Sequence, residues 1–420
     1  MKVLILTYYW PPAGGSGVQR WLKFVKYFRD FGIEPVIYTV KNPNYPIMDK
    51  SLLKDIPEGV EVLREPIWEP NNIRGKNKNT SAGFLSSKPS LMGKVLQYIR
   101  ANYFIPDARK FWIKPSVKFL TKYLNSSDID IVISTGPPHS LHLIANQLKQ
   151  QTGIKWISDF RDPWTDIDYF HQLPLRAKSQ KKHQDLEREV LKTSDAVIVV
   201  GETMKQNYLA LNSNIHVVTN GFDSDILTEN KKLDLKFTMT HIGLMNDDRN
   251  PLILWESLRE LSKEVKNFST DLQIKLIGRV SEKCLNDIHM NKLASNLKKI
   301  DYVSHNKVQE YQQSSQVLIL AINDVPSAKG IITGKIFEYL IAKRPIFAIG
   351  PEDGDLSEII KQTNSGVIVD FKDKVSMKAT ILEYYKLYKE GKLYVDSHQI
   401  EQYHRRSLTE RMSQIIKSVS

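Results

Sequence analysis

The chain of 420 residues is longer than one hydrophobic core usually organises, so it predicts two domains of roughly 200 residues each. Hydrophobic residues make up 41% of it and charged residues 25%, which is typical of a folded protein and excludes a disordered or fibrous one. The single cysteine, Cys284, excludes an internal disulfide and a thiolate zinc cluster. It favours a reducing compartment, so we expect a cytoplasmic protein.

The net charge of +12 is unevenly distributed along the sequence. Because no stretch approaches the roughly 18 apolar residues that a spanning helix requires, any membrane contact is expected to be peripheral, on the inner face of the cell membrane. Nearly all the excess charge lies between residues 71 and 127, where one acid, Asp107, accompanies Arg74, Lys76, Lys78, Lys88, Lys94, Arg100, Arg109, Lys110, Lys114, Lys118 and Lys122.

Short apolar runs alternate with helical patterns along most of the chain, which is typical of parallel sheets built from βαβ units. Their near-continuous apolar character indicates sheets covered on both faces. The first series of predicted strands comprises residues 3–7, 35–40, 129–135, 155–160, 196–200 and 215–219. The second comprises residues 237–243, 272–278, 298–303, 317–322, 345–350 and 367–370, with helices including 251–264 and 334–343.

Between the two series lie the turn Asn220-Gly221-Phe222-Asp223 and a polar stretch, residues 228–236, which we interpret as the linker. We therefore expect an α/β chain of two Rossmann-like, doubly wound parallel-sheet domains, residues 1–222 and residues 223–397. A last helix in residues 398–420 is expected to return to the first domain.

The first strand leads into a glycine-rich loop, Gly14-Gly15-Ser16-Gly17, that opens a predicted helix. Gly15 and Gly17 would let the backbone approach a phosphate or sugar at the helix N-terminus. A dinucleotide fingerprint is absent, because Arg20 stands where the third glycine would be, so NAD is not expected. A tight turn without a ligand is the alternative.

Two further loops follow strands of the first series, where open α/β sheets bind ligands. In Gly136-Pro137-Pro138-His139, His139 could donate a hydrogen bond to a substrate hydroxyl or phosphate; an exposed or helix-capping histidine is the alternative. In the second loop, Asp159, Arg161 and Asp162 suggest acceptor binding, general base catalysis or a structural ion pair. No metal site is predicted there.

In the second half, two loops join a strand to a helix and offer cations at the helix start. Gly243 begins the first loop, and Arg249 could hold a diphosphate or simply be a surface arginine. In the second, Lys329, Gly334 and Lys335 precede or open a helix that contains Glu338. A lysine at a helix start opposes the helix dipole, so a bound anion is plausible there; a solvated charge is the alternative for Glu338.

Taken together and in this order, the sequence resembles the glycosyltransferases of family 4. The motifs that carry the resemblance are Gly14-Gly15-Ser16-Gly17, Gly136-Pro137-Pro138-His139, Asp159-Phe160-Arg161-Asp162-Pro163-Trp164, Asn220-Gly221-Phe222-Asp223 and Lys335-Ile336-Phe337-Glu338-Tyr339-Leu340. The resemblance implies a GT-B fold, with two Rossmann-like domains facing across a cleft. It also implies a nucleotide-sugar donor held mainly by the C-terminal domain, no obligatory metal or cofactor, and retention of anomeric configuration.

By this resemblance Glu338 would bind the donor ribose and His139 would contact the donor sugar. Two family features are missing: Gly330 replaces the first acid of the Glu-x7-Glu pattern, and Leu244 stands at the position of the diphosphate arginine. Arg249 lies near the position of the family lysine. Lys335 or Lys329 would then supply the missing cation that stabilises the departing diphosphate.

The basic segment contains a predicted amphipathic helix. Its apolar face comprises Leu91, Met92, Val95, Leu96, Ile99 and Tyr103, while Lys94 and Arg100 lie off that face. Such a helix suits an anionic membrane surface. A nucleic-acid surface is the rival, without any recognised module to support it, and a helix packed on its own domain is the plain alternative.

These patterns lead us to expect a metal-independent glycosyltransferase. It would pass a sugar from a nucleotide donor to a saccharide, in particular a lipid-linked saccharide, in surface polysaccharide assembly. A GT-B-fold nucleotide-sugar epimerase and a catalytically silent saccharide-binding protein are the alternatives.

Overall fold

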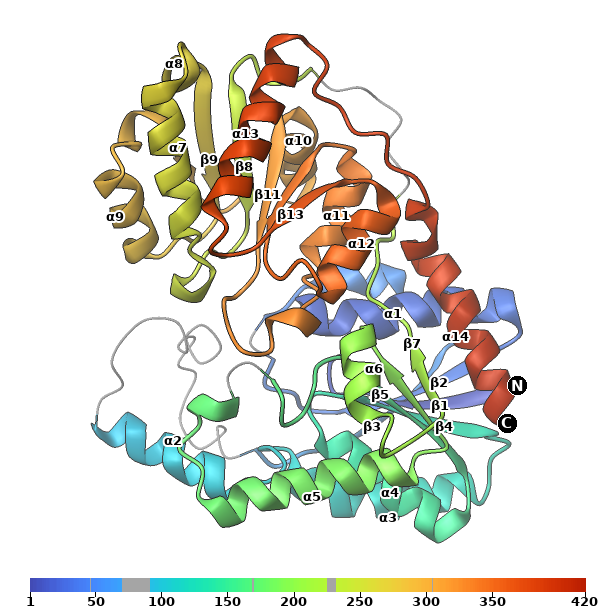
Figure 1. Cartoon of the computed structure of the whole chain (residues 1–420). Helices are drawn as coiled ribbons and strands as arrows, with labels where there is room; N and C mark the ends of the chain where they lie inside the picture. The colour runs from blue at the N-terminus through green and yellow to red at the C-terminus, as the bar shows by residue number, and fades with distance from the viewer. Residues whose placement is uncertain (46, 70–90, 168–169, 225–231, 304) are drawn as a thin grey trace. The chain divides into compact units, whose positions relative to one another are not determined.

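A computed structural model describes residues 1–420 except 46, 70–90, 168–169, 225–231 and 304 (Figure 1). The chain forms two compact units, which are described separately. The first comprises Met1–Asp223 and Arg405–Ser420, and the second comprises Ser224–His404.

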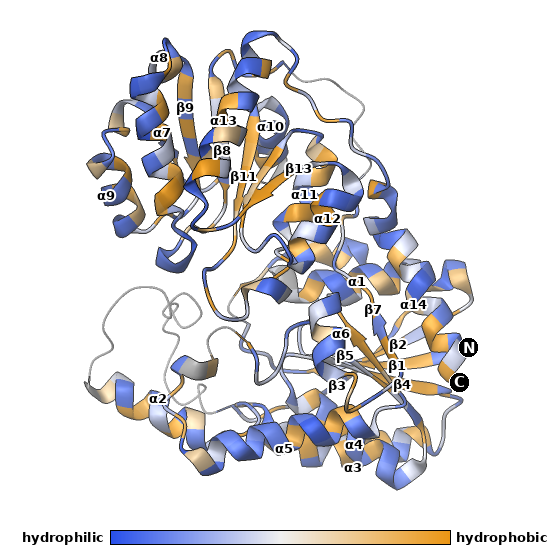
Figure 2. Cartoon of the chain, viewed as in Figure 1, coloured by the Kyte–Doolittle hydropathy of each residue, from blue (hydrophilic) through white to orange (hydrophobic). Residues whose placement is uncertain are grey.

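The first unit is built on a parallel sheet of seven strands among the described residues, in the order β3-β2-β1-β4-β5-β6-β7. Its central strands are buried along their whole length or nearly so, which explains their apolar sequences (Figure 2). The strands are β1 (Lys2–Leu6), β2 (Glu34–Val40), β3 (Glu61–Glu65), β4 (Ile131–Gly136), β5 (Lys155–Phe160), β6 (Ala196–Val199) and β7 (Ile215–Val217).

Helices pack around this sheet, and the C-terminal helix joins them. In α14, Leu408, Met412 and Ile416 are buried in the core of the first unit, and the helix packs beside α1. The helices are α1 (Ser16–Phe28), α2 (Leu91–Tyr103), α3 (Ile113–Leu124), α4 (Ser140–Thr152), α5 (Ala177–Thr193), α6 (Glu202–Tyr208) and α14 (Arg405–Val419). Short 3-10 helices are η1 (Arg29–Phe31), η2 (Lys50–Asp55), η4 (Lys110–Trp112) and η5 (Phe170–Gln172).

The second unit repeats the plan with a parallel sheet in the order β10-β9-β8-β11-β12-β13. Its strands are β8 (Phe237–Ile242), β9 (Leu272–Ile277), β10 (Leu297–Ile300), β11 (Val317–Ala321), β12 (Ile346–Ile349) and β13 (Gly366–Val369). The helices are α7 (Leu252–Glu264), α8 (Phe268–Asp271), α9 (Glu282–Met290), α10 (His305–Ser314), α11 (Lys335–Ala342), α12 (Asp355–Thr363) and α13 (Lys374–Lys389). Short 3-10 helices are η6 (Asp247–Arg249), η7 (Ala294–Asn296), η8 (Ala328–Gly330) and η9 (Ile400–Tyr403).

The predicted α/β class with two doubly wound sheets is confirmed, and every predicted strand corresponds to an observed one. The division between units differs slightly from the expected boundaries at 222 and 398. Residues 398–404 lie in the second unit, because Tyr403 packs on the ring of Phe337 and its hydroxyl donates to Gln362. The returning helix therefore begins at Arg405 rather than near His398.

Each sheet reverses its strand order once, between β1 and β4 in the first unit and between β8 and β11 in the second. Loops that leave the carboxyl ends of these strands diverge to opposite faces of the sheet, and open α/β sheets bind ligands at this point. The predicted site residues follow these strands: Gly15 and Gly17 follow β1, His139 follows β4, and Gly243 follows β8.

Candidate functional site

In the second unit, the switch point carries a half-buried lysine directly over a glycine. Gly243 has a left-handed backbone (φ +110°), and a Cβ built there would lie 2.6 Å from Cε and 3.1 Å from Nζ of Lys335. Lys335 is the first residue of α11, so its ammonium group adds positive charge where the helix dipole is already positive. Burial and the neighbouring Arg249 lower the pKa of Lys335 to about 7.

Arg249 lies beside this lysine on η6. Its Nε donates to Oδ1 of Asn323 at 3.1 Å and its Nη1 to the carbonyl of Leu244 at 3.2 Å. The buried His241 lies under both cations, and burial followed by Lys335 lowers its pKa to about 3. Two cationic side chains thus meet here beside a neutral histidine, and no described carboxylate forms an ion pair with Lys335. Such a site is suited to an anion.

A cavity of about 170 Å³ adjoins this site on the α7 side. Arg249 and Asp324 contribute polar groups to its wall, but most of the lining is apolar, from Ile349, Phe371 and Met377. The cavity therefore offers room beside the guanidinium group of Arg249, and Asp248, Asn250 and Lys372 are further polar residues of its lining.

The other residues predicted to bind the nucleotide-sugar donor lie in different surroundings. Glu338 is exposed in the first turn of α11, and one carboxylate oxygen accepts from Nε2 of Gln312 at 3.1 Å. Lys329 is exposed and forms an ion pair with Asp353. Gly334 caps α11 with ordinary dihedrals, and a Cβ there would meet open space. The structure thus brings Gly243, Lys335 and Arg249 together, whereas Lys329 has its own acidic partner.

In the first unit, Arg161 joins the two loops that follow β1 and β4. Its guanidinium group donates to the carbonyl of Gly17 at 2.7 Å and to the carbonyls of Gly136 and Pro137. A Cβ at Gly17 would lie 3.3 Å from Nη1 of Arg161, so a glycine leaves room for this contact. Gly15 has φ +86° and lets the loop turn into α1. Asp162 is exposed next to Arg161.

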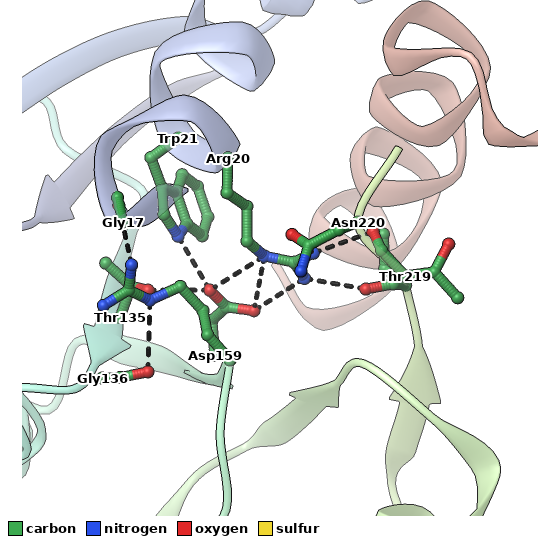
Figure 3. Close-up of polar contacts among 10 residues, drawn as sticks. Gly17, Arg20, Trp21, Thr135, Gly136, Asp159, Thr219 and Asn220 are labelled. Atoms are coloured by element: carbon green, nitrogen blue, oxygen red, sulfur yellow. Dashed lines mark hydrogen bonds and ion pairs between the residues drawn. The ribbon is translucent and has the colours of Figure 1, made fainter. Parts of the chain in front are cut away.

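Asp159 does not face a ligand. It is fully buried, and Arg20 pairs with it at 2.8 Å while Trp21 Nε1 donates at 2.7 Å and Thr135 Oγ1 at 2.8 Å (Figure 3). Arg20 also donates to the carbonyl oxygens of Val218 and Thr219. The hypothesis of a catalytic Asp159 is therefore corrected to the alternative of a structural ion pair, because its oxygens are already occupied by buried donors.

His139 lies at the start of α4 with its ring stacked on Trp164, at 4.4 Å between centroids and 5° between planes. Only 9% of the residue is exposed, and burial lowers its pKa well below the usual value, so the ring is neutral. The helix start is capped by Asp107, which accepts from the backbone N–H and hydroxyl of Ser140 at 2.9 and 2.8 Å. His139 can therefore offer a neutral ring nitrogen at the carboxyl end of β4.

Helix α2 turns its apolar side outward. Ala101, on the opposite side, and Asn102, at the edge of the apolar face, are buried. Asn102 bonds to the carbonyl of Pro174 and the backbone N–H of Arg176, while Lys94 and Arg100 are exposed. The exposed fractions are 62% for Met92, 52% for Val95, 39% for Leu96, 40% for Ile99 and 55% for Tyr103. The alternative that this face packs on its own domain is not supported.

Two qualifications concern the basic segment. Arg109 is mostly buried and pairs with Glu69 at 3.0 Å, so it does not add to the surface charge. Arg74, Lys76, Lys78 and Lys88 lie outside the described residues.

No helix in the described part of the chain has the length and apolarity to cross a membrane. Among the same residues, no group of three or more His, Cys, Asp or Glu side chains could hold a metal ion.

Comparison with known families gives an independent result. Residues 82–226 match the model of Glycosyltransferase Family 4. The matched residues lie almost entirely in the first unit, and this part of the chain is similar to glycosyltransferase family 4. The match confirms the resemblance that the motifs indicated, and it includes His139, Arg161 and the linker turn. A search of curated proteins finds no match to the sequence.

Solved structures resemble the whole chain, not only the residues that the family model matches. Anabaena HepE in complex with UDP has a TM-score of 0.63 at 12% identity and covers 100% of both chains. Sucrose-phosphate synthase from Thermosynechococcus elongatus has a TM-score of 0.62 at 12% identity, covering 99% of this chain and 98% of its own. The lipopolysaccharide outer core galactosyltransferase WaaB has a TM-score of 0.62 at 15% identity, covering 100% and 99%. At these identities the likeness concerns the fold, and it confirms the expected GT-B fold.

Three residues of the sites were not predicted from the sequence. In the sequence, Arg20 stands out only because it replaces a glycine. In the structure, Phe24, one turn later on the same side of α1, packs under its guanidinium group. His142 and His241 are buried histidines inside apolar runs, and only that context could have indicated them.

Proposed function

We propose that the chain is a glycosyltransferase that binds the diphosphate of a nucleotide sugar at Lys335 and Arg249. The observation that supports this most directly is the half-buried Lys335 ammonium group, which lies beside Arg249, has a lowered pKa and forms no ion pair with a described carboxylate. Holding a lysine there costs free energy, and a bound diphosphate would offset this cost through charge-assisted hydrogen bonds. The same cations would stabilise the charge that develops on the leaving diphosphate.

The position of Glu338 supports a nucleotide at this site. Its carboxylate lies one turn along α11 from Lys335 and is exposed, so it can accept hydrogen bonds from ribose hydroxyls. Uridine is the first base to test, because HepE was crystallised with UDP and with UDP-glucose. We propose that no metal or other cofactor is needed, with Lys335 and Arg249 supplying the charge that a metal would otherwise provide, and that transfer proceeds with retention.

The acceptor side of the proposal depends on the first unit. The outward apolar face of α2, with Lys94 and Arg100 next to it, is consistent with an interfacial helix on an anionic membrane. We therefore propose a lipid-linked saccharide acceptor at the cytoplasmic membrane surface, for surface polysaccharide assembly. The name of WaaB, a lipopolysaccharide outer core galactosyltransferase, agrees with this kind of reaction. No nucleic-acid partner is proposed.

The proposal can be tested by following a labelled sugar. The intact protein is incubated with UDP-, GDP- and ADP-sugars labelled in the sugar, together with anionic vesicles that carry extracted glycolipids. We expect label in the lipid phase with one nucleotide series, without added divalent metal. Lys335→Met should abolish this transfer. Lys386→Met, an exposed lysine of α13, should leave it unchanged.

Other outcomes of the same experiment would indicate the alternative functions. An epimerised nucleotide sugar formed without any acceptor would indicate the epimerase. Saccharide binding without turnover of any nucleotide sugar would indicate the silent scaffold. Transfer that persists in Lys335→Met would refute the assignment of the diphosphate site.

A further inference from the structure

The ring of His139 is held by stacking and not by hydrogen bonds. Its Nδ1 is buried without a hydrogen-bond partner, and no described residue forms a hydrogen bond with its Nε2. The ring lies flat on the indole of Trp164, with 4.4 Å between centroids and 5° between planes. The rings of Phe160 and His142 lie farther from it, at 6.2 and 5.8 Å, and both are tilted by 35°. Among the described residues, Trp164 therefore makes the closest ring contact with His139.

Trp164 is itself held by two side chains of α5. Its indole Nε1 donates to Nδ1 of His183 at 3.1 Å, and its backbone N–H donates to Oε1 of Glu187 at 3.2 Å. His183 and Glu187 stand four residues apart on α5, so they lie on one face of the helix, one turn apart. One helix thus holds both the side chain and the backbone of Trp164.

His183 is suited to accept this hydrogen bond. Burial lowers its pKa to about 4, so at neutral pH the ring is neutral and has one nitrogen lone pair. The indole N–H can only donate, so this lone pair is on Nδ1 of His183. Phe170 packs edge-on against the ring, with 5.4 Å between centroids.

Glu187 is a buried carboxylate that gathers donors from three elements. In addition to the backbone of Trp164, it accepts from the backbone N–H of Thr165 at 3.3 Å, from the hydroxyl of Thr165, and from the hydroxyl of Tyr208 at 2.8 Å. The loop after β5, helix α5 and helix α6 therefore meet at one side chain. With these donors bound to it in the interior, Glu187 is a structural acceptor and not a candidate general base.

We infer that Trp164 is a positioning residue: held by α5, it fixes the plane of the His139 ring and thereby the direction in which His139 offers a nitrogen to its ligand. The χ2 torsion of a histidine has broad minima, so a ring without hydrogen bonds depends on its packing for a defined orientation. That the ligand is a nucleotide-sugar donor rests on the proposed function; the positioning of the ring does not.

The orientation of the ring can be measured without any substrate. Protein labelled with 13C in its histidine rings is studied by NMR, and His139→Ala identifies the His139 signals. Protons above the face of an indole are shifted upfield, because the ring current opposes the applied field there. We expect this shift for His139 in the wild type, a smaller shift in Trp164→Phe and none in Trp164→Leu. An unshifted His139 in the wild type, or an unchanged shift in Trp164→Leu, would overturn the inference.

The contribution of α5 is tested by a matched pair of variants that leave Trp164 in place. His183→Asn keeps an acceptor oxygen near the position of Nδ1, whereas His183→Leu leaves the buried indole N–H unpaired. The upfield shift of His139 should be retained in His183→Asn and reduced in His183→Leu. Wild-type shifts in both variants would refute the part of the inference that assigns α5 the holding of Trp164.

In sugar transfer, a double-mutant cycle separates positioning from a general structural effect. Trp164→Leu should lower kcat by up to about 100-fold, as expected when a contacting group is misplaced by about 1 Å, and Trp164→Phe should retain more of the activity. The change in KM should be smaller, because the diphosphate is bound at Lys335 and Arg249 in the proposed function. In a His139→Ala background, Trp164→Leu should cost little more, since the ring that it positions is gone.

Losses that multiply in the double variant would overturn the inference. A wild type that shows the upfield shift of His139 but no transfer would refute the proposed function and leave the positioning of His139 by Trp164 standing.

Discussion

Lys335 occupies the space that a side chain at residue 243 would fill: a Cβ on Gly243 would lie 2.6 Å from Cε of the lysine. The glycine that follows β8 and the lysine that begins α11 therefore fit one another across the switch point of the second sheet. The aliphatic chain is enclosed and the ammonium group is held beside Arg249, which explains why the pKa of Lys335 falls to about 7. This relationship underlies the proposed diphosphate site.

The affinity for a nucleotide sugar is predicted to fall as pH rises. A bound diphosphate favours the ammonium form of Lys335, which predominates below pH 7 in the free protein, given its pKa of about 7. Above that pH binding must take up a proton, so Kd should rise by up to about tenfold per pH unit. UDP-glucose suits the titration from pH 6 to 9 because its diphosphate charge is constant over this range.

The control for this prediction is Lys335→Arg, which stays charged up to pH 9 and should show no such dependence. A wild-type Kd that is constant from pH 6 to 9, measured by calorimetry, would contradict the assigned role of Lys335.

Gly243→Ala is predicted to weaken nucleotide binding by more than about tenfold. The new methyl group would displace Lys335, and a residue other than glycine is strained at φ +110°. Gly391→Ala is the matched control in the same unit, because Gly391 also has a positive φ (+68°) but a Cβ there meets nothing within 4 Å. Equal losses in the two variants would show that the fit between Gly243 and Lys335 is unimportant for binding.

Asp159→Asn is predicted to destabilise the first unit by about 3–5 kcal/mol, because it leaves the buried guanidinium of Arg20 without its counterion. The loss should appear in urea unfolding followed by tryptophan fluorescence, since Trp21 donates to the same carboxylate. Asp128→Asn removes an exposed partner of Lys2 and should leave the transition unchanged. A fully stable but inactive Asp159→Asn protein would instead restore a catalytic role for Asp159.

Ile99→Glu on α2 is predicted to lower binding to anionic vesicles by about 10-fold or more, as expected when one large apolar side chain no longer enters the lipid. Lys94→Glu should weaken binding to anionic vesicles but not to neutral ones. The control is Val375→Glu, which changes an apolar residue of α13 that is 81% exposed. Vesicle sedimentation gives the comparison, and equal binding by Ile99→Glu and wild type would remove α2 from the membrane proposal.

Both sheets could be predicted from the sequence because their strands are buried on two faces and appear as apolar runs. Strand β3 was not predicted: it forms the edge of the first sheet, its side chains are exposed or half-buried, and Glu61-Val62-Leu63-Arg64-Glu65 has no apolar run. Helix α2 and its apolar face follow directly from helical spacing, whereas the exposure of that face is seen only in the structure.

The site was harder to predict, because its chemistry depends on contacts between distant residues. Asp159 and Arg161 stand two positions apart in one motif, yet the first is enclosed by Arg20 and the second bonds three backbone carbonyls. The sequence offered Lys329 and Lys335 as equivalent cations. Only the structure distinguishes them, since Lys329 pairs with Asp353 while Lys335 is half-buried over Gly243.

The most direct test of the central claim is a calorimetric titration of the wild type and Lys335→Met with UDP-, GDP- and ADP-glucose at pH 6.5 in the presence of a chelator. The account predicts that one nucleotide series binds the wild type without metal and that Lys335→Met loses this binding. Equal binding by both proteins, or no binding of any nucleotide sugar to the wild type, would contradict it.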